Sequence, residues 1–112
     1  MASIAATGAG RGPIVYTISK HAMLGLTREL AFFAGHMNIN VNAILPGGVA
    51  TEMIAEALND ESNPAVQLIK ASPAERPADP REIARVAVFL ASDDASFLHG
   101  EGITADGGFT LL

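Results

Sequence analysis

Apolar residues recur every three to four positions over residues 14–35, and this spacing predicts one long helix. One apolar stripe of that helix is formed by Ile18, Ala22, Leu26, Leu30 and Phe33. Met23 and Phe32 lie off the stripe, so the helix has a second apolar face. We expect burial against more than one neighbour, such as a partner subunit, and we expect Gly35 to end the helix.

Three segments have the pattern of β-strands. The first is the short apolar run at residues 1–5, and the second is the β-branched, alternating run at residues 39–45. The third is a final short strand at residues 102–106. A strand end, a long helix and a strand in succession form a βαβ unit, which implies parallel pairing. We therefore predict an α/β fold with about three parallel strands and crossover helices.

Shorter helices are expected between the last two strands. Residues 50–58 and 65–71 have helical patterns, and a polar stretch separates them. A further helix is expected to begin with Asp79 as its N-cap and Pro80 in its first turn. Asp93 and Asp94 are expected to follow its end, without a metal-binding role.

Several polar residues fall where the predicted strands end. Ser3 and the turn Pro46-Gly47-Gly48 follow strands, and Tyr16 opens the connecting helix. Ligands bind outside the carboxyl ends of strands in open parallel sheets, so these residues are expected to share one site. Tyr16 and Lys20 are four residues apart and share a helix face. An ammonium favours the phenolate, and such a tyrosine can exchange protons near neutral pH, although the pair alone is also typical of an exposed helix edge.

The glycine-rich segment of residues 7–13 has some features of a phosphate-binding loop. Their spacing does not fit a dinucleotide fingerprint, because Gly8 and Gly10 are followed by Pro13 at the place of the third glycine. We interpret this loop as a mobile connection near the site.

Composition narrows the possible classes of function. At 112 residues the chain forms at most one small domain, and 49% apolar residues with a mean hydropathy of +0.30 indicate surfaces that are covered by a neighbour. A net charge of −5 without a basic run argues against nucleic acid. The absence of cysteine excludes disulfides and thiolate metal sites. Neither a transmembrane segment nor a signal peptide is recognisable, so we expect no membrane association and a cytoplasmic location.

Taken together, these motifs resemble the short-chain dehydrogenase/reductase family. Tyr16 and Lys20 match its Tyr-x-x-x-Lys signature, and Ser3, thirteen residues upstream of the tyrosine, matches its catalytic serine. Residues 41–51 are similar to the segment that closes over nicotinamide. The remaining matches lie in the helix after Tyr16 and in the C-terminal part of the chain: residues 20–28, 83–84, 89–93, Gly100 and 106–108.

The resemblance implies a fold and a chemistry. Residues 1–112 would form the C-terminal part of a Rossmann-like, doubly wound parallel sheet, as a partial domain of the family. The reaction would be hydride transfer between NAD or NADP and the carbonyl or secondary alcohol of a small molecule. Members of the family also form homo-oligomers.

The resemblance also implies residue roles. The catalytic residues would be Ser3, Tyr16 and Lys20: Tyr16 would transfer the proton, Ser3 would hydrogen-bond the substrate oxygen, and Lys20 would favour the ionised tyrosine. Cofactor contacts would come from Tyr16, Lys20, Pro46, Gly47, Val49 and Thr51.

Other family elements do not occur within residues 1–112. These are the glycine-rich first turn, the residue that selects NAD or NADP, the Asn-Asn-Ala-Gly strand and the catalytic asparagine. The chain is therefore expected to be a truncated member, a fragment or a gene product started at an internal methionine. An alternative is a non-enzymatic remnant that docks on full-length relatives. Alone, the chain is expected to be marginally folded or to self-associate, and to bind neither dinucleotide measurably.

Overall fold

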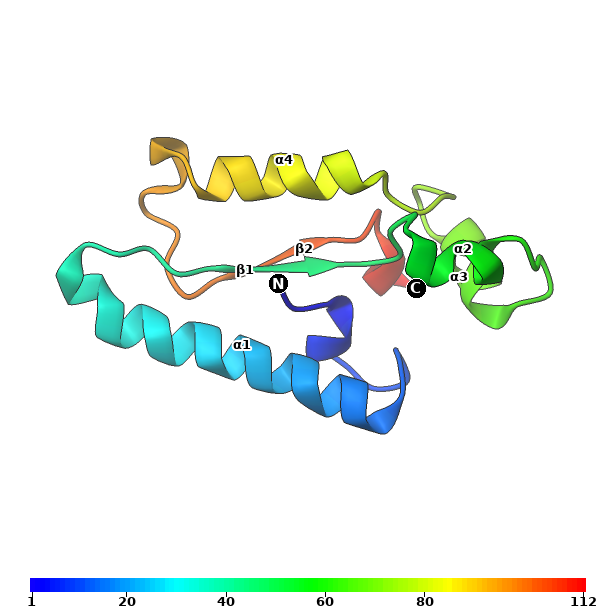
Figure 1. Cartoon of the computed structure of the whole chain (residues 1–112), viewed down its shortest axis with the longest axis horizontal. Helices are drawn as coiled ribbons and strands as arrows, with labels where there is room; N and C mark the ends of the chain where they lie inside the picture. Colours follow the sequence, from blue (N-terminus) through cyan, green and yellow to red (C-terminus); the bar gives the residue numbers. More distant parts are fainter.

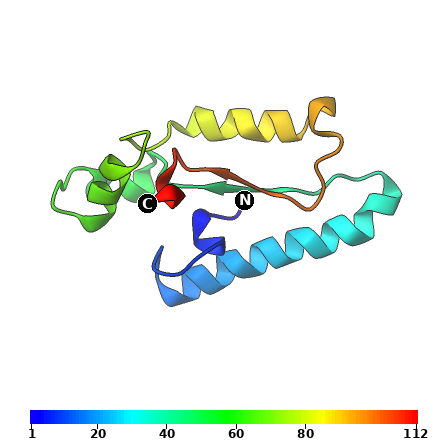
Figure 2. The same ribbon diagram turned by 180° about the vertical axis from the view of Figure 1, so that it is seen from behind.

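A computed structural model describes residues 1–112, except for the side chain of Met53. Four α-helices and two β-strands follow one another in the order α1 (Ile14–Ala34), β1 (Ala43–Pro46), α2 (Glu52–Leu58), α3 (Pro64–Ala71), α4 (Pro80–Leu90) and β2 (Gly102–Ala105). Short 3-10 turns are present at Ile4–Ala6, Gly35–Met37, Asp93–Ala95 and Phe109–Leu111. The two strands form a layer between α1 and α4, while α2 and α3 lie beyond the carboxyl ends of the strands (Figures 1 and 2).

The predicted α/β class and the parallel pairing are confirmed. β1 pairs with β2 in parallel, with Ala43 opposite Gly102 and Pro46 opposite Ala105. The ladder continues past the strand end, because the Gly47 N–H donates to the Ala105 carbonyl at 3.1 Å. This arrangement is a small piece of a parallel sheet with a helix on each face.

The strand expected near residues 39–45 begins later than predicted, at Ala43. Asn38 has a left-handed backbone, with φ of 57°. The side-chain amide of Asn40 donates to the Ser96 carbonyl at 3.2 Å, and that of Asn42 to the Leu98 carbonyl at 2.8 Å. These asparagines tie the segment to the chain before β2 through side chains, and the Gly100 N–H adds a backbone bond to the Val41 carbonyl at 2.8 Å. Regular strand pairing starts after them, at Ala43.

The strand predicted near residues 1–5 is wrong. The Ala2 N–H donates to the Ile44 carbonyl at 2.9 Å, which is the hydrogen bond a neighbouring strand would begin with. The chain then turns into the 3-10 segment Ile4–Ala6, and the Ser3 hydroxyl caps that turn by accepting from the Ala5 N–H at 3.2 Å. A local serine cap competes with strand pairing, and here one ladder bond does not outweigh it.

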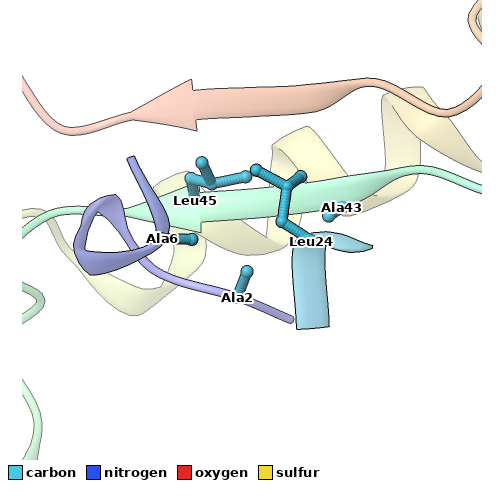
Figure 3. Packing of buried hydrophobic residues seen from close by; sticks show 5 residues of the cluster. All are labelled: Ala2, Ala6, Leu24, Ala43 and Leu45. Atoms are coloured by element: carbon cyan, nitrogen blue, oxygen red, sulfur yellow. The ribbon is translucent and has the colours of Figure 1, made fainter. Parts of the chain in front are cut away.

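The core is small and centres on Leu45 of β1. Leu45 is only 1% exposed and packs with Leu24 of α1 and with three alanines, Ala2, Ala6 and Ala43 (Figure 3). A Cβ at Gly102 would lie 3.0 Å from Cδ1 of both Leu24 and Leu45. Glycine at this position of β2 therefore lets the strand approach the two leucines closely.

The bounds of α1 are confirmed, but its predicted stripe is not the face that meets the sheet. The residues buried on α1 are Leu24, Thr27, Ala31 and Ala34. Of the predicted stripe, Leu26 is 49% and Leu30 47% exposed. The helix has two apolar faces, and the one with small side chains packs inward, because alanines let a helix lie close to a sheet.

The N-terminus of α4 is confirmed in detail. Asp79 is the N-cap and Pro80 is in the first turn. The Asp79 side chain accepts from the Arg81 N–H at 2.8 Å, and Glu82 accepts from the Asp79 N–H at 2.8 Å, which completes a capping box. α2 and α3 also form close to their predicted bounds. Within the described residues, none of these helices is both long and apolar enough to cross a membrane.

Candidate active site

A cavity of about 750 Å³ lies at the carboxyl end of β1. The structure brings Ser3, Tyr16, Gly47 and Gly48 together in its lining, although they come from three separate segments of the chain. The opposite wall is built by α2, α3 and the C-terminal residues, the elements that lie beyond the strand ends in Figure 1. The other predicted residues, Lys20, Pro46, Val49 and Thr51, do not line this cavity.

Ser3 is positioned by its neighbours on both sides. The preceding Ala2 N–H is bound to the Ile44 carbonyl of β1, and the following residues form a 3-10 turn. Ser3 is half-buried, and its oxygen accepts one hydrogen bond, from Ala5. A serine hydroxyl can accept and donate at once, so its proton remains available to an oxygen atom in the cavity.

Tyr16 and Lys20 share one face of the first turns of α1. The Lys20 ammonium lies 5.2 Å from the centroid of the Tyr16 ring, within the range of a cation–π contact. Tyr16 is 40% exposed, so its ring is reachable from the cavity. Gly12 allows this placement, because a Cβ there would lie 2.8 Å from Cδ1 of the tyrosine.

The two glycines after β1 permit very close packing. A Cβ at Gly47 would lie 2.9 Å from the Cα of Asp106, and one at Gly48 would lie 2.7 Å from Cδ1 of Ile69. The turn is therefore held between the end of β2 and α3. Burial alone would raise the pKa of Asp106, but hydrogen bonds from Thr110 and from the Gly108 N–H outweigh it, and the pKa lies below its usual value.

Val49 keeps its backbone polar groups available. Ala78 bridges the residues on either side: its N–H donates to the Gly48 carbonyl and its carbonyl accepts from the Ala50 N–H, each at 2.9 Å. Among the described residues, the N–H and C=O of Val49 itself have no hydrogen-bond partner. An unpaired donor and acceptor on one residue suit a planar amide ligand.

Pro46 and Thr51 have different surroundings. Pro46 is buried at the end of β1 and has no N–H to donate. Thr51 is exposed at the N-cap of α2, and its side chain does not cap the helix.

Sequence reasoning missed Arg11. The loop of residues 7–13 is predicted only as a connection, yet Arg11 lines the cavity beside Tyr16. Its Nη1 donates to the Ile4 carbonyl and to the Thr7 hydroxyl, both at 3.0 Å. The signal in the sequence is a single arginine in a glycine-rich loop, and nothing in that pattern predicts the direction of its side chain.

The chain is similar to known proteins over most of its length. Residues 1–110 match the family model described as "Enoyl-(Acyl carrier protein) reductase". Among curated proteins, the chain is 44% identical over 97 residues to an A-factor type gamma-butyrolactone 1'-reductase of Streptomyces virginiae. That match covers 87% of this chain and 38% of the relative, so the chain spans about two fifths of its length.

Solved structures of dehydrogenases are also similar to this chain. A 4-hydroxyisoleucine dehydrogenase complexed with NADH is 33% identical, with a TM-score of 0.91, and the match covers 99% of this chain and 45% of that protein. A putative 2-deoxy-d-gluconate 3-dehydrogenase of Agrobacterium tumefaciens with bound NADP is 34% identical, with a TM-score of 0.90 and the same coverage.

Proposed function

Because the chain belongs to the short-chain dehydrogenase/reductase family, we propose that it provides the catalytic half of an NAD(P)-dependent oxidoreductase acting on a carbonyl or secondary alcohol. The observation that carries this proposal is the cavity shared by Ser3, Tyr16 and the Gly47–Gly48 turn. The 5.2 Å approach of the Lys20 ammonium to the Tyr16 ring adds the charge that a proton-transferring tyrosine needs.

The nicotinamide end of the cofactor fits the residues present. The unpaired N–H and C=O of Val49 match the donor and acceptor of a carboxamide, and the Thr51 hydroxyl is close in the chain. Gly47 and Gly48 line the cavity, and their lack of side chains lets this turn pack closely against Asp106 and Ile69. Lys20 would hold ribose hydroxyls, and the buried Pro46 would keep the turn rigid. When bound, the nicotinamide supplies or accepts the hydride.

This chain's own residues transfer the proton. In the reducing direction, Tyr16 donates its phenolic proton to the carbonyl oxygen, and the nearby Lys20 ammonium stabilises the phenolate that remains. Ser3 donates a hydrogen bond to the same oxygen and so stabilises the negative charge that develops on it. In the oxidising direction the phenolate accepts the proton of the alcohol.

Homo-oligomer formation is part of this proposal. Ile18, Phe32 and Phe33 of α1 are 63%, 70% and 65% exposed, on a helix whose other side already packs on the sheet. Such a large apolar surface on one helix is typical of a face that another protein covers.

The experiment is a comparison of Tyr16→Phe with the parent in a chimaera, in which the first half of a solved relative precedes residue 1. We expect turnover to fall by about 10²–10⁴-fold, the usual contribution of general acid–base catalysis. Ser19→Ala is the matched control, because it removes a hydroxyl from the same helix that bonds only to the Tyr16 carbonyl, at 2.7 Å. Near-parental turnover of Tyr16→Phe would disprove the role of Tyr16.

A second comparison addresses the non-enzymatic alternative. A remnant would associate with a full-length relative, but its chimaera would not turn over any carbonyl substrate. Turnover that depends on Tyr16 would therefore favour the enzyme.

A further inference from the structure

The cavity that contains Ser3 and Tyr16 also contains a fixed positive charge. Arg11 lines it, and apart from Tyr16 it is the one ionisable side chain among the described residues of the lining. Within that part of the chain Arg11 forms no salt bridge, since the two that are present join Lys70 to Glu61 and Arg76 to Glu82. A cation without an anionic partner in a substrate cavity is a candidate for ligand recognition.

One nitrogen holds the guanidinium of Arg11 in place. Nη1 donates to the Ile4 carbonyl and to the Thr7 hydroxyl, and that hydroxyl itself donates to the Ile4 carbonyl at 2.8 Å. The loop closes around the group, because a Cβ at Gly8 would lie 3.2 Å from the guanidinium carbon. The orientation of the planar group is therefore restricted before any ligand arrives.

The rest of the guanidinium is available. Neither Nε nor Nη2 of Arg11 has a hydrogen-bond partner among the described residues. These two nitrogens form one edge of the planar group, and their parallel N–H bonds match the two oxygens of a carboxylate. Lysine could not replace this geometry, because its ammonium is a point charge.

Most of the remaining wall is apolar. It is built by Ile54 and Leu58 of α2, Val66 and Ile69 of α3, and Phe109 near the C-terminus. No aspartate or glutamate side chain belongs to the described lining, so an anionic ligand would meet no like charge from a side chain there. The last residue of the chain, Leu112, also lines the cavity, and no salt bridge joins its carboxylate to Arg11 among the described residues. The cavity thus combines a largely apolar wall with one oriented side-chain cation.

We propose that Arg11 binds a carboxylate of the substrate, so that the site takes oxo acids and hydroxy acids with an apolar body. This inference rests on the proposed function, because Tyr16 must reach the carbonyl or hydroxyl of the same molecule. Arg11 orients the acid group, the apolar wall covers the hydrocarbon part, and the oxygen that reacts lies toward Ser3 and Tyr16.

The test is a binding measurement on the 112-residue chain, and it needs neither cofactor nor turnover. Tyr16 is the only tyrosine and there is no tryptophan, so tyrosine fluorescence reports on this cavity alone. Octanoate and octanamide have the same hydrocarbon chain and differ in charge. We expect octanoate to bind with a dissociation constant at least about tenfold lower, as a charge-assisted bidentate contact implies. Equal affinity for the two probes would overturn the proposal.

Variants test whether the preference for octanoate over octanamide depends on Arg11. In Arg11→Met the ratio of the two dissociation constants should fall to within about twofold, whereas the matched control Arg28→Met, which removes a charge from the exposed side of α1, should keep the parental ratio. Thr7→Val retains the arginine but removes one acceptor of Nη1, and it should give an intermediate ratio. If Arg11→Met kept the parental ratio of the two dissociation constants, the proposal would be contradicted. If Arg11→Met does not fold, a parental ratio in Thr7→Val would contradict it instead.

The two proposals fail in different ways. Discrimination between octanoate and octanamide that depends on Arg11 would support the carboxylate site even if Tyr16→Phe left turnover unchanged. A loss of turnover in Tyr16→Phe without such discrimination would support the oxidoreductase and reject the role of Arg11.

Discussion

The Lys20 ammonium lies 5.2 Å from the centroid of the Tyr16 ring, one turn further along the same face of α1. The contact is local to one helix and does not depend on the two-stranded sheet. It places a positive charge beside the tyrosine ring, and the same tyrosine lines the cavity.

Replacement of Lys20 by methionine should weaken both rate and cofactor binding in the chimaera, because the ammonium is proposed to act on Tyr16 and on the ribose. We expect kcat to fall and KM for the dinucleotide to rise, each by about tenfold or more. Lys70→Met is the control, since Lys70 pairs with Glu61 on the exposed surface of α3. An unchanged KM for the cofactor would limit Lys20 to a role in proton transfer.

Two glycine substitutions should have opposite effects on stability. Gly102→Ala should lower the free energy of unfolding by about 1–3 kcal/mol, because the new methyl would lie 3.0 Å from Leu24 and Leu45 in the core. Gly25→Ala should raise it by about 0.5–1 kcal/mol, because no atom lies within 4 Å of its Cβ and alanine favours the interior of α1. Urea denaturation of both variants measures the difference, and equal midpoints would contradict the packing around Leu45.

Acid should weaken the start of α4. The hydrogen bonds from Arg76 and from the Asp79 N–H lower the pKa of Glu82 to about 2 from the ordinary 4.5. A carboxyl with a depressed pKa in the folded state contributes stability above its unfolded pKa, and that contribution is lost as pH falls from 4.5 toward 2. The melting temperature should therefore fall less steeply between pH 4.5 and pH 2 in Glu82→Gln than in the parent.

Glu56→Gln on the exposed side of α2 is the matched control for this pH dependence. It should retain the parental slope. If Glu82→Gln had the same slope as the parent, the ion pair with Arg76 would not contribute to stability in solution.

The exposed apolar surface of α1, with Ile18, Phe32 and Phe33, should mediate association between copies of the chain. Phe33→Glu places a charge on a side chain that is 65% exposed, and it should shift the chain toward monomer in analytical ultracentrifugation if this surface is an interface. Thr17→Glu is a suitable control, because it adds the same charge to the first turns of α1, away from Phe33. A parental distribution of species in Phe33→Glu would assign the apolar surface to another role.

Local signals in the sequence predicted several features correctly. The spacing of apolar residues predicts α1, and Gly35 follows its last residue. Asp79 and Pro80 begin α4, since capping needs only residues close in the chain. The four-residue spacing of Tyr16 and Lys20 places both side chains on one face for the same reason.

Tertiary packing decided the features that depend on neighbours distant in sequence. The periodicity of α1 is compatible with two apolar faces, and contact with the sheet selects the one with Ala31 and Ala34. Residues 1–5 have a strand pattern, but strand formation requires a partner, and the serine cap prevails where one ladder bond is made.

By itself, the sequence determined the bounds of α1, the start of α4, the parallel α/β class and the placement of Tyr16 beside Lys20. Each of these follows from interactions within a few residues or from connectivity. Only the tertiary structure decided that Arg11 faces the same cavity as Ser3 and Tyr16. The direction of that side chain is determined by two acceptors, Ile4 and Thr7, and their positions depend on how the first residues pack between β1 and α1.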